Sequence, residues 1–320
     1  MRAVAASTGR LKTGIRMAAI GVALCAAGFG LLWVWPPIAV ALAMLGAVAT
    51  FMAGGTANVG TTRLAGQVGA LLYALTVYRA SGSVLLGAAG GVPLLAFGAV
   101  EPLVPRIGYK AGRLFPLFVV AGLALLAAAW PFGWWGLAVV PPLFLVGFMS
   151  LGVARGLGDM KRHTPARWPA AIGDTAPSVR ATTRDGGAFD LAEERGRWVM
   201  LCFLRGDWCA VCQIMMRTYK KHAAVLAQHN VKLVAVSPSG GPEAQEFAHD
   251  LGLDYAILAD TDLAVARAFG ALHPKSAPGG GDTALPVSFL VDPQGVIRAA
   301  TRSEDPASYQ SPLSVLALVH

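Results

Sequence analysis

Acidic residues are almost missing from the first 154 positions of this 320-residue sequence, and histidine is missing there altogether. This part holds nine Lys or Arg and a single acid, Glu101, whereas positions 155–320 hold 17 basic and 17 acidic residues. The net charge of +8 therefore belongs to the first part. Its cations stand at the ends of apolar stretches and do not alternate with aromatic residues on a polar face, so we expect no nucleic-acid partner.

Cysteine is also scarce, with four residues in the whole sequence, and this density excludes a disulfide-stapled scaffold. Cys25 and Cys202 lie in apolar stretches, where a thiol usually packs as a small hydrophobic side chain. Cys209 and Cys212 form a C-x-x-C motif, a pattern that also makes half of a zinc site. The sequence has no second C-x-x-C and no histidine pair at the usual spacing, so we expect no metal ion and no cofactor beyond the cysteine pair.

What the first part has in abundance is apolar sequence. A hydrocarbon layer about 30 Å thick needs roughly 20 apolar residues per helix, and several stretches meet or approach this length. We therefore predict a multi-pass transmembrane domain of four to six helices over residues 1–154, with the lipid bilayer as its partner. The predicted spans are residues 17–35, 38–52, 64–78, 83–100, 114–130 and 134–154. The third and fourth are short and Gly-rich, so a re-entrant hairpin is an alternative for them.

The distribution of Lys and Arg predicts the orientation, because cytoplasmic loops carry an excess of these residues. Clusters at the N-terminus, near residue 63, at 106–113 and after residue 154 all agree with six spans and a cytoplasmic N-terminus. We expect an integral protein of the bacterial inner membrane whose second domain lies on the cytoplasmic side. Residues 155–169 are charged and contain Pro and Gly, which predicts a basic linker.

The second domain, residues 170–320, shows apolar strand-like runs that alternate with segments of helical periodicity. The predicted strands are 198–204, 231–236, 255–258, 287–291 and 296–299. The predicted helices are 209–228, 243–250, 263–269 and 313–319. This alternation predicts an α/β layer fold.

The cysteine pair lies where the first of these strands gives way to a long helix. Cys209 is then expected at the helix N-terminus, where unpaired N–H groups and the helix dipole lower the pKa of a thiol. Cys212 follows one turn later on the same face. This spacing lets the second thiol attack a mixed disulfide formed on the first, which is thiol-disulfide exchange.

The run Cys-Phe-Leu-Arg-Gly-Asp-Trp-Cys-Ala-Val-Cys at 202–212 resembles the active-site segment of the thioredoxin-like superfamily, in particular its AhpC/TSA or peroxiredoxin-like branch. Residues 172–178, 259–270 and 285–295 resemble that branch's opening, late helix and final hairpin. The resemblance covers about residues 170–320. It implies a thioredoxin-like domain, with a central mixed sheet flanked by helices, behind the helical membrane domain.

Two mechanisms compete within this resemblance. In thioredoxin-like reductases the first cysteine attacks and the second resolves, which implies Cys209 and Cys212 in these roles. The family places a cis proline opposite the pair, at the position of Pro286, and an aromatic residue before the first cysteine, here Trp208. These two residues are expected to position the substrate. An ordinary edge-strand proline and a simple packing role are the respective alternatives.

In peroxiredoxins the peroxidatic cysteine matches Cys212. The hydroxyl residue expected three positions earlier is replaced by Cys209, and the arginine usually found before the last strands is replaced by a Leu-Pro pair. Arg205 is an auxiliary candidate that could supply the missing charge, with a solvated surface arginine as the alternative reading. Asp207 is a second auxiliary candidate, for proton transfer, if it is not simply solvated.

Together these features predict a membrane-anchored thiol-disulfide oxidoreductase that serves antioxidant defence or thiol redox homeostasis. Its partners would be protein or small-molecule thiols and disulfides. A peroxiredoxin-like thiol peroxidase that reduces hydroperoxides is one alternative, and a non-enzymatic redox sensor is the other. All three use the same redox-active cysteine pair and its disulfide.

Overall fold

A computed structural model describes residues 4–57, 60–103, 108–131, 133–250, 252–301 and 315–319. The chain forms two compact units, which are considered separately. The helical unit comprises Thr8–Pro102 and Ala111–Arg155. The α/β unit comprises Gly156–His320 together with two short segments from earlier in the chain.

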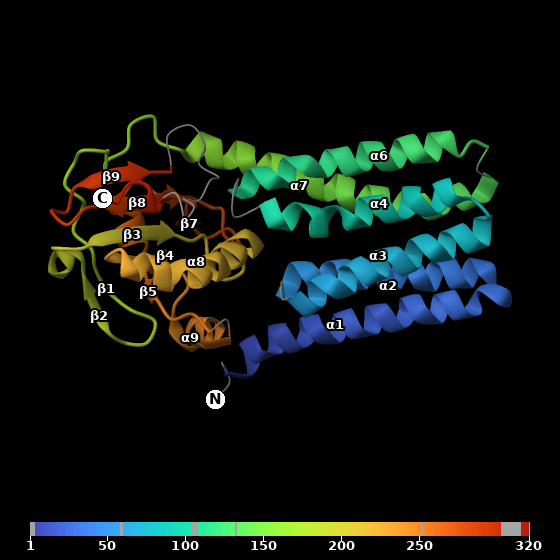
Figure 1. The fold of residues 1–320 in the computed structure, drawn as a ribbon, viewed down its shortest axis with the longest axis horizontal. Coiled ribbons are helices and arrows are strands. Elements are labelled where there is room, and N and C mark those ends of the chain that lie inside the picture. Colours follow the sequence, from blue (N-terminus) through green and yellow to red (C-terminus); the bar gives the residue numbers. More distant parts are fainter. Residues whose placement is uncertain are drawn as a thin grey trace. The chain divides into compact units, whose positions relative to one another are not determined.

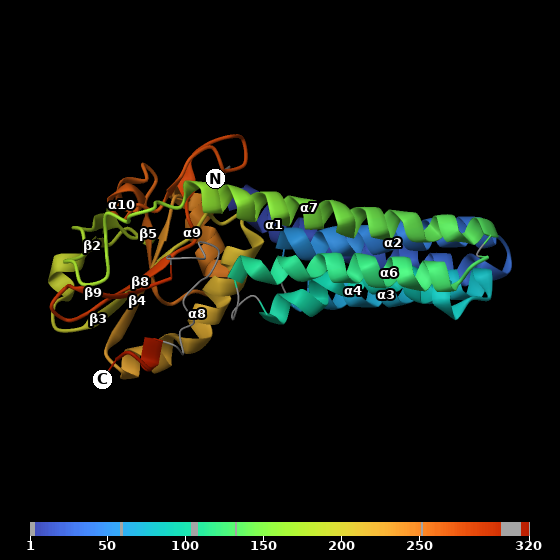
Figure 2. The ribbon, with the colours of Figure 1, turned by 90° about the horizontal axis from the view of Figure 1, so that it is seen from above.

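Long helices that run roughly parallel to one another make up the helical unit (Figures 1 and 2). They are α1 (Val4–Gly30), α2 (Pro36–Ala57), α3 (Gly60–Ser81), α4 (Val84–Val100), α6 (Phe115–Ala128) and α7 (Val140–His163). Short 3-10 segments stand at Leu31–Trp33, Glu101–Leu103, Gly108–Leu114 and Gly133–Val139. Each predicted span overlaps one of these helices. The third and fourth stretches form the helices α3 and α4.

Three helical stretches are long and apolar enough to cross a membrane, namely Thr13–Trp33, Ala111–Ala128 and Gly133–His163. Pro36–Thr50 and Val84–Ala96 are equally apolar in character but shorter. Most of the side chains in the three long stretches face outward from the protein, although they are apolar. A surface of this kind suits a hydrocarbon environment better than water.

Helices α1 and α2 approach each other closely through small residues. A Cβ atom added to Gly46 would lie 2.4 Å from the backbone oxygen of Gly21, and one added to Gly21 would lie 2.7 Å from the oxygen of Gly46. Beside this contact Cys25 is fully buried, and its thiol donates to the backbone oxygen of Ala43 at 3.3 Å. Small residues at helix contacts are typical of packing within membranes. The predicted packing role of Cys25 is confirmed.

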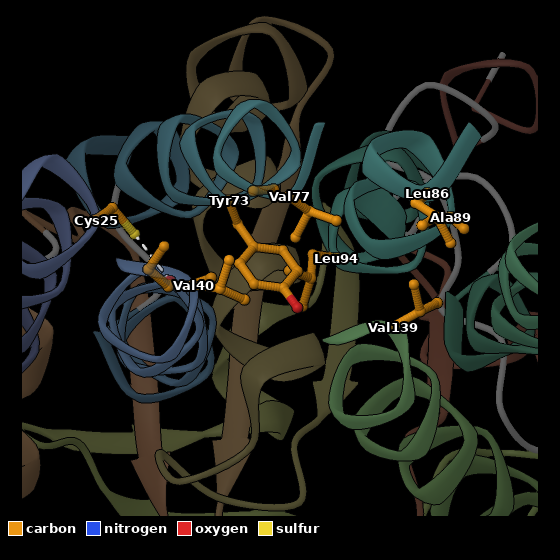
Figure 3. Packing of buried hydrophobic residues seen from close by; sticks show 11 residues of the cluster. Cys25, Val40, Tyr73, Val77, Leu86, Ala89, Leu94 and Val139 are labelled. Carbon is orange, nitrogen blue, oxygen red and sulfur yellow. Dashed lines mark hydrogen bonds between the residues drawn. The ribbon is translucent and has the colours of Figure 1, made fainter. Parts of the chain in front are cut away.

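Tyr73 of α3 occupies the centre of the helical unit, within a cluster of buried apolar residues (Figure 3). Its ring is fully buried, and its hydroxyl donates to the backbone oxygen of Ala138. A buried tyrosine hydroxyl normally finds such a partner, because leaving it unpaired is costly. The contact joins α3 to the short 3-10 segment before α7.

The α/β unit is built on a five-stranded sheet with the order β5-β4-β3-β8-β9. Its strands are β3 (Trp198–Phe203), β4 (Val231–Ser237), β5 (Ala256–Ala259), β8 (Ser288–Val291) and β9 (Ile297–Ala300). β3, β4 and β5 are parallel, whereas β8 runs antiparallel to both β3 and β9. Small hairpins join β1 (Arg180–Thr182) to β2 (Ala188–Asp190) and β6 (Leu272–His273) to β7 (Thr283–Ala284). The predicted strands are all present.

Helix α8 (Ala210–Gln228) connects β3 to β4 and packs on β4 (Figure 1). Two shorter helices follow, α9 (Gly241–Asp250) and α10 (Ala264–Ala268). A mixed sheet with β3 at its centre and a helix after it is the thioredoxin-like arrangement. The predicted helix at 313–319 begins outside the described residues, of which Val315 is buried.

The predicted linker at 155–169 is wrong in its first half, because α7 continues through Arg155 to His163. Asp159 lies one turn before Arg162 and forms an ion pair with it at 3.6 Å. Basic residues in the last turn also favour a helix, because they oppose its dipole. Met160 is almost fully buried, which adds packing energy that the polar composition of the segment concealed.

The contact between α1 and α2 can be tested with Gly46→Ala. The added methyl group meets the backbone of α1, so the helices must separate, and overpacking of this kind costs about 1–3 kcal/mol. We expect a lower melting temperature for the full chain in detergent, measured by circular dichroism. Gly147→Ala in α7 is the matched control, because no atom lies within 4 Å of its added Cβ. A Gly46→Ala protein as stable as the control would contradict the close contact.

Candidate active site

Cys209 is the N-cap residue of α8, and its position follows from the end of β3 a few residues earlier. Its backbone is extended, and its Sγ accepts a hydrogen bond from the Cys212 N–H at 3.2 Å. The Sγ of Cys212 in turn lies 3.4 Å from the backbone N–H of Arg205. The predicted helix N-terminus is confirmed. A sulfur in this place faces backbone donors that stabilise a negative charge on it.

Both thiols of the pair are buried. Cys209 is 4% exposed and Cys212 is fully buried. Both belong to the described residues, and neither forms a disulfide there. They differ in their place on the helix, because Cys209 stands at the N-cap of α8 and Cys212 lies one turn further along.

Asp207, predicted as an auxiliary residue that is solvated or transfers protons, is neither exposed nor isolated. Its carboxylate accepts a hydrogen bond from Arg184 at 2.7 Å, and the two side chains are only 13% and 3% exposed. The backbone N–H of Asp207 donates to the hydroxyl of Ser239 at 3.2 Å, and its backbone oxygen accepts from Gln213 at 2.7 Å. The expectation of a solvated carboxylate is therefore wrong. Asp207 fixes the loop that leads into α8.

Arg184 is the residue that sequence reasoning missed. It stands in the turn after β1, where Thr-Arg-Asp-Gly is typical of an exposed hairpin loop. Besides Asp207, its guanidinium donates to the backbone oxygens of Ala244 at 3.2 Å and Ser239 at 3.4 Å. The backbone N–H of Arg184 donates to the backbone oxygen of Ile257 in β5 at 2.8 Å. No local signal in the sequence distinguishes this arginine from a surface residue.

Arg205 is half-buried and is not the solvated arginine considered above. Its guanidinium donates to the hydroxyl of Ser276 at 2.7 Å and to the backbone oxygen of the same residue at 3.0 Å. It also lies over the ring of Trp208, 5.0 Å from the ring centroid. Trp208 is itself 37% exposed next to the cysteine pair. An arginine on a partly exposed indole forms a surface that a substrate can contact.

Pro286 is buried two residues before β8 begins, and the backbone oxygen of the next residue, Val287, accepts a hydrogen bond from the N–H of Phe203 at 2.8 Å. The proline therefore stands beside the end of β3, in the segment that leads into β8. The resemblance implied a cis peptide bond here. In the described residues the cis bond precedes Pro131 instead, so the bond before Pro286 is trans. That expectation is wrong, whereas a substrate-positioning role for Pro286 remains a prediction.

Cys202 lies in the middle of β3 and is fully buried, as the sequence predicted. Burial raises the pKa of its thiol to about 12, because the charged form loses its hydration. At neutral pH this cysteine is therefore a protonated packing residue. It pairs in register with Ser288 of β8 and takes no part in the redox pair.

Comparisons with known proteins place the α/β domain in a family. The AhpC/TSA family matches residues 172–300, so this segment forms an AhpC/TSA family domain. Peroxiredoxin tpx1 of Schizosaccharomyces pombe is 28% identical over 145 residues, which cover 42% of this chain and 73% of that protein. Thioredoxin peroxidase of Fasciola hepatica is 29% identical over 141 residues, or 41% and 70% of the two chains. Thiol-disulfide oxidoreductase ResA of Geobacillus thermodenitrificans is 29% identical over 130 residues, or 40% and 67%. The domain thus belongs to a family of thiol-based oxidoreductases.

Solved structures show the same likeness at lower identity. Peroxidoxin BcpB of Mycobacterium tuberculosis is 19% identical with a TM-score of 0.41, and the match covers 47% of this chain and 99% of that one. AhpC of Enterococcus faecalis is 22% identical with a TM-score of 0.40, and the match covers 47% and 90%.

The Arg184–Asp207 pair can be tested with Arg184→Ala. Removing one partner of a buried ion pair leaves the other charge poorly solvated and costs about 3–5 kcal/mol. We expect the opening free energy of the α8 and β3 amides to fall by this order, measured by hydrogen exchange on the full chain. Arg180→Ala is the matched control, because Arg180 also pairs with an aspartate at 2.8 Å but is 78% exposed. Its loss should cost about 0–1 kcal/mol. Equal losses would mean that the buried pair does not hold the loop.

Proposed function

We propose that the protein is a membrane-anchored thiol-disulfide oxidoreductase in which Cys209 is the attacking thiol and Cys212 the resolving thiol. The observation that carries this assignment is the place of Cys209 at the N-cap of α8, with its sulfur hydrogen-bonded by a helix N–H, whereas Cys212 lies one turn inside the helix. The identity to a protein named thiol-disulfide oxidoreductase supports the same reading.

In this proposal the Cys209 thiolate attacks one sulfur of a substrate disulfide, and the other sulfur leaves as a thiolate. The resulting mixed disulfide is then attacked by Cys212 after loss of its proton. The substrate is released as a dithiol, and the pair is left as a Cys209–Cys212 disulfide. Two electrons have passed from the pair to the substrate. A thiol-containing donor must reduce the pair again before the next turnover.

A thiol peroxidase is the second candidate, and the identity to two proteins named as a peroxiredoxin and a thioredoxin peroxidase favours it. Here the Cys212 thiolate would attack a peroxide oxygen, releasing an alcohol or water and forming a sulfenic acid. Cys209 would then condense with it, giving water and the same disulfide. The burial of Cys212 and the cysteine in place of the expected hydroxyl residue weigh against this order of events.

The two candidates are separated by Cys209→Ser and Cys212→Ser in the full chain, assayed in detergent for disulfide reduction and for hydrogen peroxide consumption. We expect Cys209→Ser to lose disulfide reduction by at least about a hundredfold, because the covalent step disappears. Cys212→Ser should accumulate a mixed disulfide on Cys209 that mass spectrometry detects. Cys202→Ala is the control and should keep its activity, because the Cys202 thiol is protonated at neutral pH.

Each other outcome points elsewhere. If Cys209→Ser keeps full peroxide turnover and Cys212→Ser abolishes it, the protein is a peroxidase with Cys212 as the peroxidatic thiol. If the wild-type protein shows neither activity while its pair still cycles between dithiol and disulfide, the result supports a non-enzymatic redox sensor.

We further propose that the α-helices of the first unit span the bacterial inner membrane and that the α/β unit lies in the cytoplasm. The three long apolar stretches support the anchoring, and the clusters of Lys and Arg support the sidedness. In this arrangement the bilayer is a partner of the helical unit alone, and substrates meet the cysteine pair in the reducing compartment.

The orientation can be tested with a reporter that fluoresces only in the cytoplasm, fused after the last residue of the full chain. We expect fluorescence from this fusion. The matched control is a fusion after Trp35, which follows the first predicted span and should be dark because the reporter is then outside. The assignment would be reversed if the full-length fluorescent fusion is dark and a fusion of alkaline phosphatase, which is active only in the periplasm, is active at the same position.

A further inference from the structure

Three side chains of the α/β unit that could bind a metal ion converge away from the cysteine pair. They are Asp159 and His163, from the last turn of α7, and His273 from β6. One ring nitrogen of each histidine and a carboxylate oxygen of Asp159 all lie within 4.8 Å of one another. His273 is 1% exposed, whereas Asp159 and His163 are each about one third exposed. The group therefore has a buried side and a side open to solvent.

Two of the three residues are close together in the sequence, and the third comes from a distant segment. Asp159 and His163 are four residues apart on a helix, so their side chains project from one face of α7. His273 stands in the β6–β7 hairpin, 114 residues after Asp159, so this contact was not visible in the sequence. Its Nε2 lies 2.8 Å from Oδ2 of Asp159, and Nδ1 of His163 lies 3.5 Å from Oδ1.

The geometry points to a site for a divalent transition metal of the Zn²⁺ class, bound by Asp159, His163 and His273. Two atoms bound tetrahedrally to one zinc ion lie about 3.4 Å apart, because Zn–N and Zn–O bonds are roughly 2.0–2.1 Å long. The 3.5 Å between His163 and Asp159 is close to this value, whereas the 2.8 Å between His273 and Asp159 is a hydrogen-bond distance that would lengthen when both groups bind the ion. Two imidazoles and one carboxylate are ligands that zinc accepts readily, and three protein ligands leave a fourth position for water.

The two ring nitrogens of His273 have different surroundings. Nε2 faces Asp159 and would be the ligand atom. Nδ1 is buried without a hydrogen-bond partner among the described residues, and it would carry the ring proton when Nε2 binds the ion. His163 places its Nδ1 3.0 Å from the backbone oxygen of Asp159, and His222 and His229 make the same kind of contact at 2.9 Å, but only His163 belongs to a group of three metal-binding side chains in the described part of the chain.

Metal binding would tie the end of α7 to the β6–β7 hairpin, and this hairpin touches the active-site loop. His273 pairs in register with Thr283 of β7, and the Thr283 hydroxyl donates to the backbone oxygen of Arg205. The N–H of Arg205 contacts the sulfur of Cys212 at 3.4 Å. The metal would stabilise the β6–β7 hairpin that contacts the loop before the cysteine pair, and it would take no electrons itself.

The test is a Zn²⁺ titration by calorimetry on the full chain in detergent. Because Cys209 and Cys212 can bind zinc themselves, the reference protein carries Cys209→Ser and Cys212→Ser, and all variants are made in it. We expect one Zn²⁺ per chain and a rise in melting temperature on binding, since the ion stabilises the folded state. Co²⁺ in the same site should give a visible spectrum without a thiolate charge-transfer band.

Asp159→Asn and His163→Ala should each weaken zinc binding at least about tenfold. Even the loss of a residue that only hydrogen-bonds a metal ligand weakens metal affinity by about this factor. These two positions are partly exposed, so their variants should fold normally. His229→Ala is the matched control. Like His163, His229 places its Nδ1 near the backbone oxygen of the fourth residue before it, and its loss should change the zinc affinity by no more than about twofold.

Zinc affinity that is equal in the reference protein and in Asp159→Asn and His163→Ala would overturn the proposal, and so would the absence of saturable binding in the reference protein. Because the reference protein lacks the redox pair, this result is independent of whether the proposed exchange reaction is correct.

Discussion

The buried ion pair between Arg184 and Asp207 is the contact on which the geometry of the redox site depends. Asp207 stands two residues before Cys209, so whatever holds Asp207 also holds the first turn of α8. Two charges withdrawn from water are costly unless their remaining hydrogen-bonding groups are satisfied. Here the guanidinium also contacts two backbone oxygens, while its Nε has no partner among the described residues, and the backbone of Asp207 is fixed by Ser239 and Gln213.

This network joins parts of the α/β unit that are distant in the sequence. Arg184 follows β1, Ser239 follows β4, and Ala244 belongs to α9, so three segments meet at one side chain. The sheet alone would fix only the end of β3. The loop from Arg205 to Trp208 needs this additional anchor, because a backbone that crosses from a strand to a helix has few hydrogen bonds of its own. Helix α8 itself keeps the two sulfurs one turn apart, and the ion pair fixes the loop that precedes it.

The sequence predicted those features that depend on local pattern. The apolar runs at 198–204 and 231–236 and the amphipathic helix between them were sufficient to place Cys209 at a helix start, and the structure agrees. Contacts across many residues were not accessible. Arg184 and Asp207 are 23 residues apart, and a Thr-Arg-Asp-Gly turn resembles any exposed hairpin. The continuation of α7 to His163 was hidden because its polar composition is also that of a linker.

The distribution of thiols limits how electrons can reach the pair. Exchange by thiols needs two sulfurs that can approach each other, and the sequence has a single cysteine, Cys25, before residue 155. That cysteine is fully buried and donates to a backbone oxygen of α2. The helical unit therefore cannot relay electrons by disulfide exchange. If the proposed function is correct, the donor and the acceptor must both meet Cys209 on the α/β unit. They must bind there in turn, because the pair can hold one mixed disulfide at a time.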